Sequence, residues 1–343
     1  MSETIVALLT LGVLILFHEL GHFLAGKKLG VYIHEFSIGF GPRLLSRASG
    51  ETQFCLRMIP LGGFVRFAGE EGEKEDEDSH IPRERLLYSL SPGKRSAILF
   101  AGPLMNLLVA ALAFFLVFSF VGFGRPTTEF GEVVPGYPAH ESGILPGDRV
   151  VRVEDVPVAQ WEDMVRVIQS RAGVPTELTV ERDGQELTFT VVPVESDGVG
   201  IIGVRSGVEF VRLGIFEGLK EGIKETFYVS AMWITSIVQM IVGKVAPEVT
   251  GPLGISQLLG EAARHGLGSL LYLAGAISAN LALINLLPIP ALDGSRLLFT
   301  GIEAVRGKPI DPEKESFVHL VGFFLLMIVF LVVTYKDIMR LIQ

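Results

Sequence analysis

The chain has 343 residues, of which 49% are hydrophobic, and its mean hydropathy is +0.47. These values exceed what a single soluble domain needs, so they predict a membrane protein that also carries some soluble mass. The formal net charge of −9 argues against nucleic acid as a partner. The single cysteine, Cys55, excludes an intrachain disulfide and a multi-cysteine zinc site, and we interpret it as a small buried hydrophobic residue.

Four apolar stretches are long enough to cross a bilayer, which takes about 20 residues. They cover residues 4–26, 97–121, 269–292 and 317–335. The chain begins Met-Ser-Glu-Thr, without Lys or Arg, so we expect an uncleaved anchor rather than a signal peptide. Lys27 and Lys28 follow the first stretch, and the positive-inside rule then predicts that this span runs from the outer side into the cytoplasm.

The loop between the first two spans is basic, as a cytoplasmic loop should be, and completes a first membrane segment over residues 1–124. Within it, residues 53–68 predict a β-hairpin that turns at Leu61-Gly62-Gly63, with apolar Phe64 and Val65 after the turn. An exposed strand edge here could pair with an extended peptide, and a purely structural hairpin is the alternative. The acidic run 69–79 is interpreted as a solvated loop.

Residues 125–207 are predicted to form a small α+β domain on the outer side, between the second and third spans. Trp161, Met164, Val165 and Ile168 share one face of a short helix. Alternating apolar residues on both sides of Asp183-Gly184 predict a β-hairpin. Residues 208–268 follow as a linker, and 269–343 form the second membrane segment.

The first span contains "HELGH", in which His18 and His22 stand four residues apart with Glu19 between them. This spacing places both histidines on one face of a helix. It matches H-E-x-x-H, a zinc site whose glutamate acts as general base. An ionisable residue inside a membrane span costs at least about 2.5–3.5 kcal/mol for Asp, Lys or Arg, which favours a functional role. Two satisfied structural histidines are the alternative.

A catalytic zinc takes three protein ligands and a water. The favoured third ligand is Asp293 in "NLLPIPALDG", where Pro288 and Pro290 should break the helix and free backbone groups at membrane depth. Alternatively, Asp293 caps a helix that starts at Gly294. The other histidines compete less well, and the best of them opens the last span; they are His34, His80, His140, His265 and His319.

The shared ligand set constrains the topology. If His18 and Asp293 hold one ion, the first and third spans must run in the same direction, with one crossing between them. Residues 215–243 carry an apolar helical stripe and could be a fifth span or an amphipathic surface helix. A fifth crossing would reverse the third span, so we predict an interfacial helix.

A zinc bound by two histidines and a carboxylate, with Glu19 as base, predicts peptide hydrolysis by activated water within the membrane. The Asn285 amide, in the broken segment, could hold an extended substrate backbone. Two other classes of function compete. A membrane-anchored adaptor with a structural metal site would not need Glu19, and a metal transporter usually shows internal repeats, which we do not see in the spans.

"HELGH", "GPLMN" (residues 102–106) and "NLLPIPALDG" together resemble the site-2 proteases, which are intramembrane zinc metalloproteases. "PAHESGILPGDRVVRV" is similar to the PDZ domain of the bacterial regulator-of-sigma-E type, here with one PDZ domain. The resemblance implies a polytopic α-helical membrane protein with four spans, a cytoplasmic membrane-associated β-hairpin at residues 53–68 and an inserted extracytoplasmic α+β PDZ domain. It implies zinc ligation by His18, His22 and Asp293, Glu19 as base, and substrate contacts at Asn285, Gly62, Gly63, Phe64 and Val65, with Asn106, Pro288 and Pro290 as secondary candidates.

The resemblance also implies a partner and a location. The substrate would be a single-span membrane protein already cut outside the membrane, such as an anti-sigma factor or a remnant signal peptide. The PDZ domain would filter by size or bind a peptide C-terminus, and residues 200–207 are the predicted binding loop. We expect a multi-pass protein of the bacterial inner membrane, with its active site towards the cytoplasm.

Overall fold

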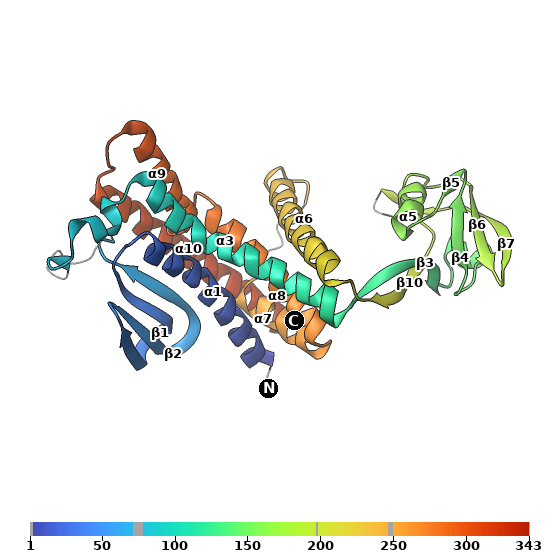
Figure 1. Cartoon of the computed structure of the whole chain (residues 1–343). Coiled ribbons are helices and arrows are strands. Elements are labelled where there is room, and N and C mark those ends of the chain that lie inside the picture. Colours follow the sequence, from blue (N-terminus) through green and yellow to red (C-terminus); the bar gives the residue numbers. More distant parts are fainter. Residues whose placement is uncertain (1–2, 71–77, 197, 246–249, 343) are drawn as a thin grey trace. The chain divides into compact units, whose positions relative to one another are not determined.

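The computed structural model describes residues 3–70, 78–196, 198–245 and 250–342. The chain forms two compact units (Figure 1). One unit comprises residues 1–121 and 213–343, and the other is the inserted stretch 122–212. Most of the predicted acidic loop, residues 71–77, lies outside the described residues.

The first unit is built on long apolar helices. Within the described ranges, four helices are long and apolar enough to cross a membrane, which confirms the number of predicted spans. They are α1 (Glu3–Lys28), α3 (Pro92–Leu116, continued by a π-helical turn at Val117–Val121), α8 (Leu267–Leu286) and α10 (Pro312–Ile342). The third span ends at Leu286 and not at residue 292, because Leu287 precedes Pro288 and is extended.

Small residues bring these helices together. Helix α3 packs against α1 and α8, and also against α6 (Ile215–Ile241) and α9 (Asp293–Arg306). A Cβ atom on Gly21 of α1 would stand 2.2 Å from the Ala101 carbonyl oxygen of α3, and one on Gly222 of α6 would stand 2.8 Å from the Phe115 nitrogen. Helices pack this closely in lipid, where burial of apolar surface no longer drives association and close backbone contact must replace it.

Helices α6 (Ile215–Ile241) and α7 (Pro252–Arg264) complete the segment before α8. Helix α6 is not among the four candidate spans found in the described part of the chain, so an interfacial position for it stays a prediction. Its first half buries a row of small residues four apart, Gly218, Gly222, Thr226 and Ser230. The buried Asp337 carboxylate of α10 accepts hydrogen bonds from the amides of Gly251 and Gly254 at the start of α7.

The strands β1 (Ile33–Ser49) and β2 (Thr52–Phe67) form an antiparallel pair. The predicted hairpin about residues 61–63 is wrong, because the two segments on either side of it do not pair with each other. The chain reverses at Gly50, whose φ of +63° suits a tight turn, and β2 continues through Gly62. The two halves of β2 pair with β1 instead of with each other, so that Ser37 has Phe64 and Cys55 as its two partners. The positive φ of Gly62 lies in the bend between these halves, and residues 53–56 and 63–67 run in opposite directions on the two edges of residues 35–38.

The inserted unit is an α+β fold with strand order β10-β3-β4-β6-β7, and β5 pairs with β4. The predicted hairpin at Asp183-Gly184 is confirmed, and both turn residues have positive φ. Helix α5 (Trp161–Gln169) buries Met164 and Ile168 against the core, as its pattern predicts. The remaining elements are β3 (Phe123–Val133), α4 (Pro138–Glu141), β4 (Arg149–Val153), β5 (Val156–Pro157), β6 (Thr176–Arg182), β7 (Gln185–Val191), β8 (Val194–Ser196), β9 (Val199–Ile201) and β10 (Val204–Val211).

Candidate metal centre

Three side chains from distant parts of the sequence converge inside the first unit, which carries the four membrane-length helices. His18 and His22 lie on one face of α1, each 7% exposed, and Asp293 is the first residue of α9 (Asp293–Arg306). The Nε2 atoms of the two histidines are 3.2 Å apart, and Asp293 Oδ2 lies 3.1 Å from that of His18 and 3.3 Å from that of His22. Within the described residues, no other group of three or more His, Cys, Asp or Glu side chains has this geometry.

These distances fit a zinc ion. If each ligand atom stands about 2.0–2.1 Å from zinc, tetrahedral geometry separates two ligand atoms by roughly 3.3–3.4 Å. The three observed separations, 3.1–3.3 Å, are close to that value. Two nitrogens and one carboxylate oxygen also form a ligand set typical of catalytic zinc, which leaves the fourth position for water.

Helix α3 orients His22. The Nδ1–H of its ring donates to the carbonyl oxygen of Ile98 at 2.8 Å, which leaves the Nε2 lone pair facing the other two ligands. Gly102 makes room for the ring, because a Cβ atom there would stand 2.2 Å from His22 Nε2. Pro103 interrupts the hydrogen bonding of α3 next to these contacts. Neither Ile98 nor Gly102 was predicted as a site residue, although Gly102 begins the "GPLMN" motif.

Asn106, a secondary candidate, lies beside His18 and is fully buried. Its amide is 3.3 Å from His18 Nδ1, and its backbone carbonyl accepts a hydrogen bond from Ser278 of α8 at 2.8 Å. Metal binding through Nε2 leaves the ring proton on Nδ1. The side-chain carbonyl oxygen of Asn106 can accept a hydrogen bond from this Nδ1–H when the amide is turned by 180°.

The segment that carries Asp293 breaks where the prolines predict a break. Helix α8 ends at Leu286 and α9 starts at Asp293, so residues 287–292 with Pro288 and Pro290 are not helical. The alternative in which Asp293 caps a helix starting at Gly294 is wrong, because the cap position is Leu292 and Asp293 already belongs to the helix.

Glu19 and β2 meet at the same site. A Cβ atom on Gly63 would stand 3.8 Å from Glu19 Cγ, so the strand passes directly beside the glutamate. Residues 63–67 pair with β1 along one edge, and in the described part of the chain no strand pairs with their other edge. This edge includes Phe64 and Val65, and it follows Gly62. Asn285 lies half-buried in the last turn of α8, and no hydrogen bond of its side chain occurs within the described residues.

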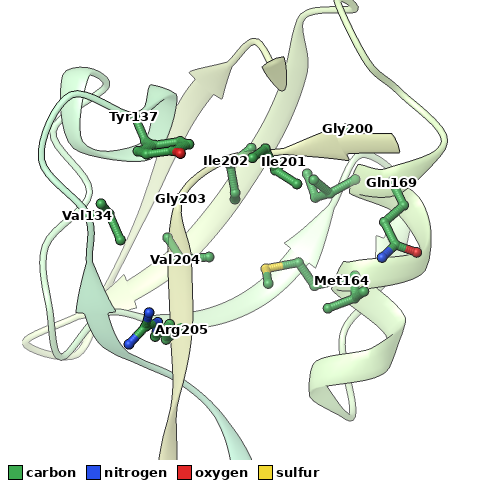
Figure 2. A pocket seen from close by; sticks show the side chains of 12 residues that line it. Val134, Tyr137, Met164, Gln169, Gly200, Ile201, Ile202, Gly203, Val204 and Arg205 are labelled. Atoms are coloured by element: carbon green, nitrogen blue, oxygen red, sulfur yellow. The ribbon is translucent and has the colours of Figure 1, made fainter. Parts of the chain in front are cut away.

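The inserted unit holds a separate cavity of about 390 Å³ (Figure 2). Met164 and Gln169 of α5 line one wall, and the chain from Gly200 to Arg205 lines the wall opposite. Most of the predicted binding loop, residues 200–207, therefore borders this cavity. The lining is mainly apolar and also includes Val134, Tyr137, Val165 and Ile168.

Four membrane-length helices, a strand pair and two helix-borne histidines facing an aspartate define a membrane protein with a candidate catalytic metal centre. The profile of peptidase family M50 matches residues 6–329, and the chain belongs to this family of metalloproteases. It is 32% identical to the zinc metalloprotease RasP of Oceanobacillus iheyensis, over 99% of this chain and 100% of the relative. It is 37% identical to a putative zinc metalloprotease of Clostridium acetobutylicum, over 97% and 96% of the two chains. Identity to the regulator of sigma-W protease RasP of Bacillus subtilis is 29%, over 99% of each chain.

Proposed function

We propose that this protein is a zinc-dependent intramembrane endopeptidase that cuts single-span membrane proteins after an earlier extracytoplasmic cut. Its metal is zinc, as in the zinc metalloproteases to which it is similar. His18, His22 and Asp293 hold the ion. The observation that carries this proposal is the meeting of their three ligand atoms at 3.1–3.3 Å, with both histidines on α1, a helix long enough to cross a membrane.

Glu19 is the general base in this mechanism. When bound, zinc would polarise the scissile carbonyl and lower the pKa of a water to about 7. The Glu19 carboxylate accepts a proton from the attacking water and then delivers it to the nitrogen of the leaving amine, so one side chain serves as base and acid. The α3 contacts to His22 and His18 keep both rings oriented during these steps.

A substrate must be extended before it can be cut, because a helix hides its carbonyl groups in hydrogen bonds. The unpaired edge of residues 63–67 supports binding by strand addition, since a Cβ atom on Gly63 in this stretch would stand 3.8 Å from Glu19 Cγ. Asn285 supplies amide donors and acceptors at the end of α8, just before the non-helical segment with Pro288 and Pro290. Both features favour a substrate that lies as a strand across the zinc site.

The substrate class follows from the relatives and the resemblance. The name regulator of sigma-W protease supports a membrane protein that controls a sigma factor, such as an anti-sigma factor. Remnant signal peptides are a second class of single-span substrate. The location we propose is the bacterial inner membrane, with the inserted unit outside and the metal centre towards the cytoplasm. The basic pair Lys27-Lys28 at the end of α1 supports this orientation.

We propose further that the inserted unit is a PDZ domain that binds a peptide C-terminus. The cavity between α5 and the chain at Gly200–Arg205 has the apolar lining that a C-terminal side chain would fill. The strand β10 beside it could add an extended peptide to the sheet. The unit would then read the newly made C-terminus of a trimmed substrate, or exclude substrates that still carry a bulky outer domain.

The test uses the full chain purified in detergent and a tagged single-span substrate without its outer domain. We expect a fragment cut within the span, no fragment after zinc chelation, and no fragment with Glu19→Gln, which should still bind zinc. Glu217→Gln, an exposed carboxylate on α6, is the matched control and should cut normally. Equal cleavage by wild type and Glu19→Gln would refute the role of Glu19. A zinc-bound wild type that cuts no single-span substrate would favour the adaptor alternative.

A further inference from the structure

The non-helical segment before Asp293, residues 287–292, has to satisfy its backbone amides without a helix. Two of its six residues are prolines, so four N–H groups remain. Three of them, from Leu287, Ile289 and Leu292, donate to carbonyl groups of the same region at 2.7–3.1 Å. The fourth, from Ala291, donates to Nδ1 of His319 in α10 at 3.0 Å. This amide alone finds its partner on another helix.

Ala291 also has an unusual backbone conformation. Its φ is +74°, in the left-handed region that residues with a Cβ atom rarely adopt. Such a conformation persists only where the surroundings impose it. Helix α10 supplies two contacts from the same face, His319 and Gly322. A Cβ atom on Gly322 would stand 2.2 Å from Pro290 Cβ, so α10 fits closely against the segment while its histidine holds the amide.

The ring of His319 is fixed from three sides. Because Nδ1 accepts the Ala291 hydrogen bond, the proton of the neutral ring resides on Nε2. Nε2 faces Oε1 of Glu315, one turn earlier on α10, at 3.7 Å. Phe299 of α9 packs edge-on against the ring, with 5.8 Å between ring centroids. The histidine therefore presents an acceptor to Ala291 in one orientation.

We propose that His319 is a positioning residue of the metal centre. It holds the amide two residues before Asp293, and thereby fixes the turn that aims the Asp293 carboxylate at His18 and His22. It does not bind the ion itself, since it lies outside the group of converging ligands. This inference rests on the proposed role of Asp293 as a zinc ligand.

The experiment compares His319→Asn with His319→Leu in the full chain, purified in detergent. The two side chains have nearly the same shape, but only Asn places an acceptor oxygen near the position of Nδ1. Zinc affinity is measured by competition with a chelator, and hydrogen exchange of residues 287–292 is measured in zinc-free protein. We expect His319→Leu to lose about 10–100-fold in zinc affinity and His319→Asn to stay within about threefold of wild type. Exchange of the Ala291 amide should rise in the Leu variant alone.

Equal zinc affinity in the Leu and Asn variants would overturn the proposal, as would wild-type affinity in His319→Leu. If the Leu variant does not fold, His319→Gln replaces it, because its acceptor lies one bond too far to replace Nδ1. Asp293→Asn, measured in parallel, separates the two proposals. If this variant keeps full zinc affinity, or if wild type binds no zinc, the ligand assignment fails and the His319 proposal falls with it. If it loses zinc while His319→Leu does not, only the positioning role fails.

Discussion

Gly102→Ala should remove zinc without unfolding the protein. The added Cβ atom would stand 2.2 Å from His22 Nε2, and its three nearest neighbours all belong to the His22 ring. To reach an ordinary contact the ring must retreat by about 1.2 Å, several times the roughly 0.2 Å tolerance of a metal–ligand distance. We therefore expect a loss of about 100-fold in zinc affinity, or about 2.8 kcal/mol. In the zinc-free protein the free energy of unfolding should fall only modestly, because moving the buried ring costs about 1–3 kcal/mol and the helix preference of Ala over Gly offsets about 1 kcal/mol of this.

The assay measures zinc affinity by chelator competition and thermal unfolding of the zinc-free protein, on the same detergent preparation. Gly93→Ala in the same helix is the matched control, because no atom lies within 4 Å of its added Cβ atom. Gly21→Ala is the contrasting variant. Its Cβ atom would stand 2.2 Å from a backbone oxygen of α3, so both zinc affinity and thermal stability should fall. Wild-type zinc affinity in Gly102→Ala would refute this reasoning.

Three further predictions concern contacts around the site and in the inserted unit. Asn106→Leu removes the amide beside His18 and should lower zinc affinity about 10–100-fold in the same competition assay. Burial disfavours the Asp148 carboxylate, yet hydrogen bonds from Arg182 lower its pKa below the ordinary value. The stabilisation of the inserted unit by this carboxylate is complete above the unfolded pKa of about 3.9 and is lost as the pH falls through the lower pKa of the folded state. Asp148→Asn should therefore make the stability depend less on pH in the acid range, as measured by acid unfolding followed by tryptophan fluorescence. Glu70 and Arg296 form a partly exposed ion pair at 2.6 Å between the end of β2 and α9. Changing either to Gln should reduce kcat less than about fivefold, and exchanging the two charges should restore it; a 100-fold loss would contradict this estimate.

The parts of the site that could be predicted from the sequence are those with a local signature. Two histidines four apart with a glutamate between them specify a helix face and a chemistry together. Asp293 stands out because two prolines must break an apolar span just before it. Both inferences need only the spacing of neighbouring residues. The structure brings these residues together at ligand distances.

The supporting contacts could not be predicted, because they have no local signature. His22 is oriented by the carbonyl oxygen of Ile98, a group that every residue carries, across 76 positions of the chain. Gly102 acts by having no side chain at all. His319 looked like a weak candidate ligand, and its contact with the Ala291 amide depends on how α10 packs against the broken segment. Such contacts depend on tertiary packing alone.

The error at residues 61–63 has a similar cause. A Gly-Gly pair between two apolar runs is a strong local turn signal. In the structure both halves of β2 find a better partner in β1, which is long enough to pair with each of them. Gly50 reverses the chain between β1 and β2, and the bend at Gly62 carries β2 from one edge of residues 35–38 to the other. Which strand a segment pairs with is decided by long-range contacts, so a local glycine signal cannot distinguish a bend from a turn.

The contact between α1 and α3 does not require a metal ion, whereas the contact between α1 and α9 at the metal centre does. Gly21 and the His22–Ile98 hydrogen bond hold α1 against α3 whether or not an ion is present. In contrast, α1 and α9 meet at the site through His18, His22 and Asp293. Without a cation, the lone pairs of the two ring nitrogens and the carboxylate oxygen repel one another. A bound cation would accept all three lone pairs and turn this repulsion into attraction. Zinc held by these three residues would therefore tie the non-helical segment to α1. Its removal should loosen residues 287–293 first and leave the α1–α3 contact intact, because that contact does not involve the ion.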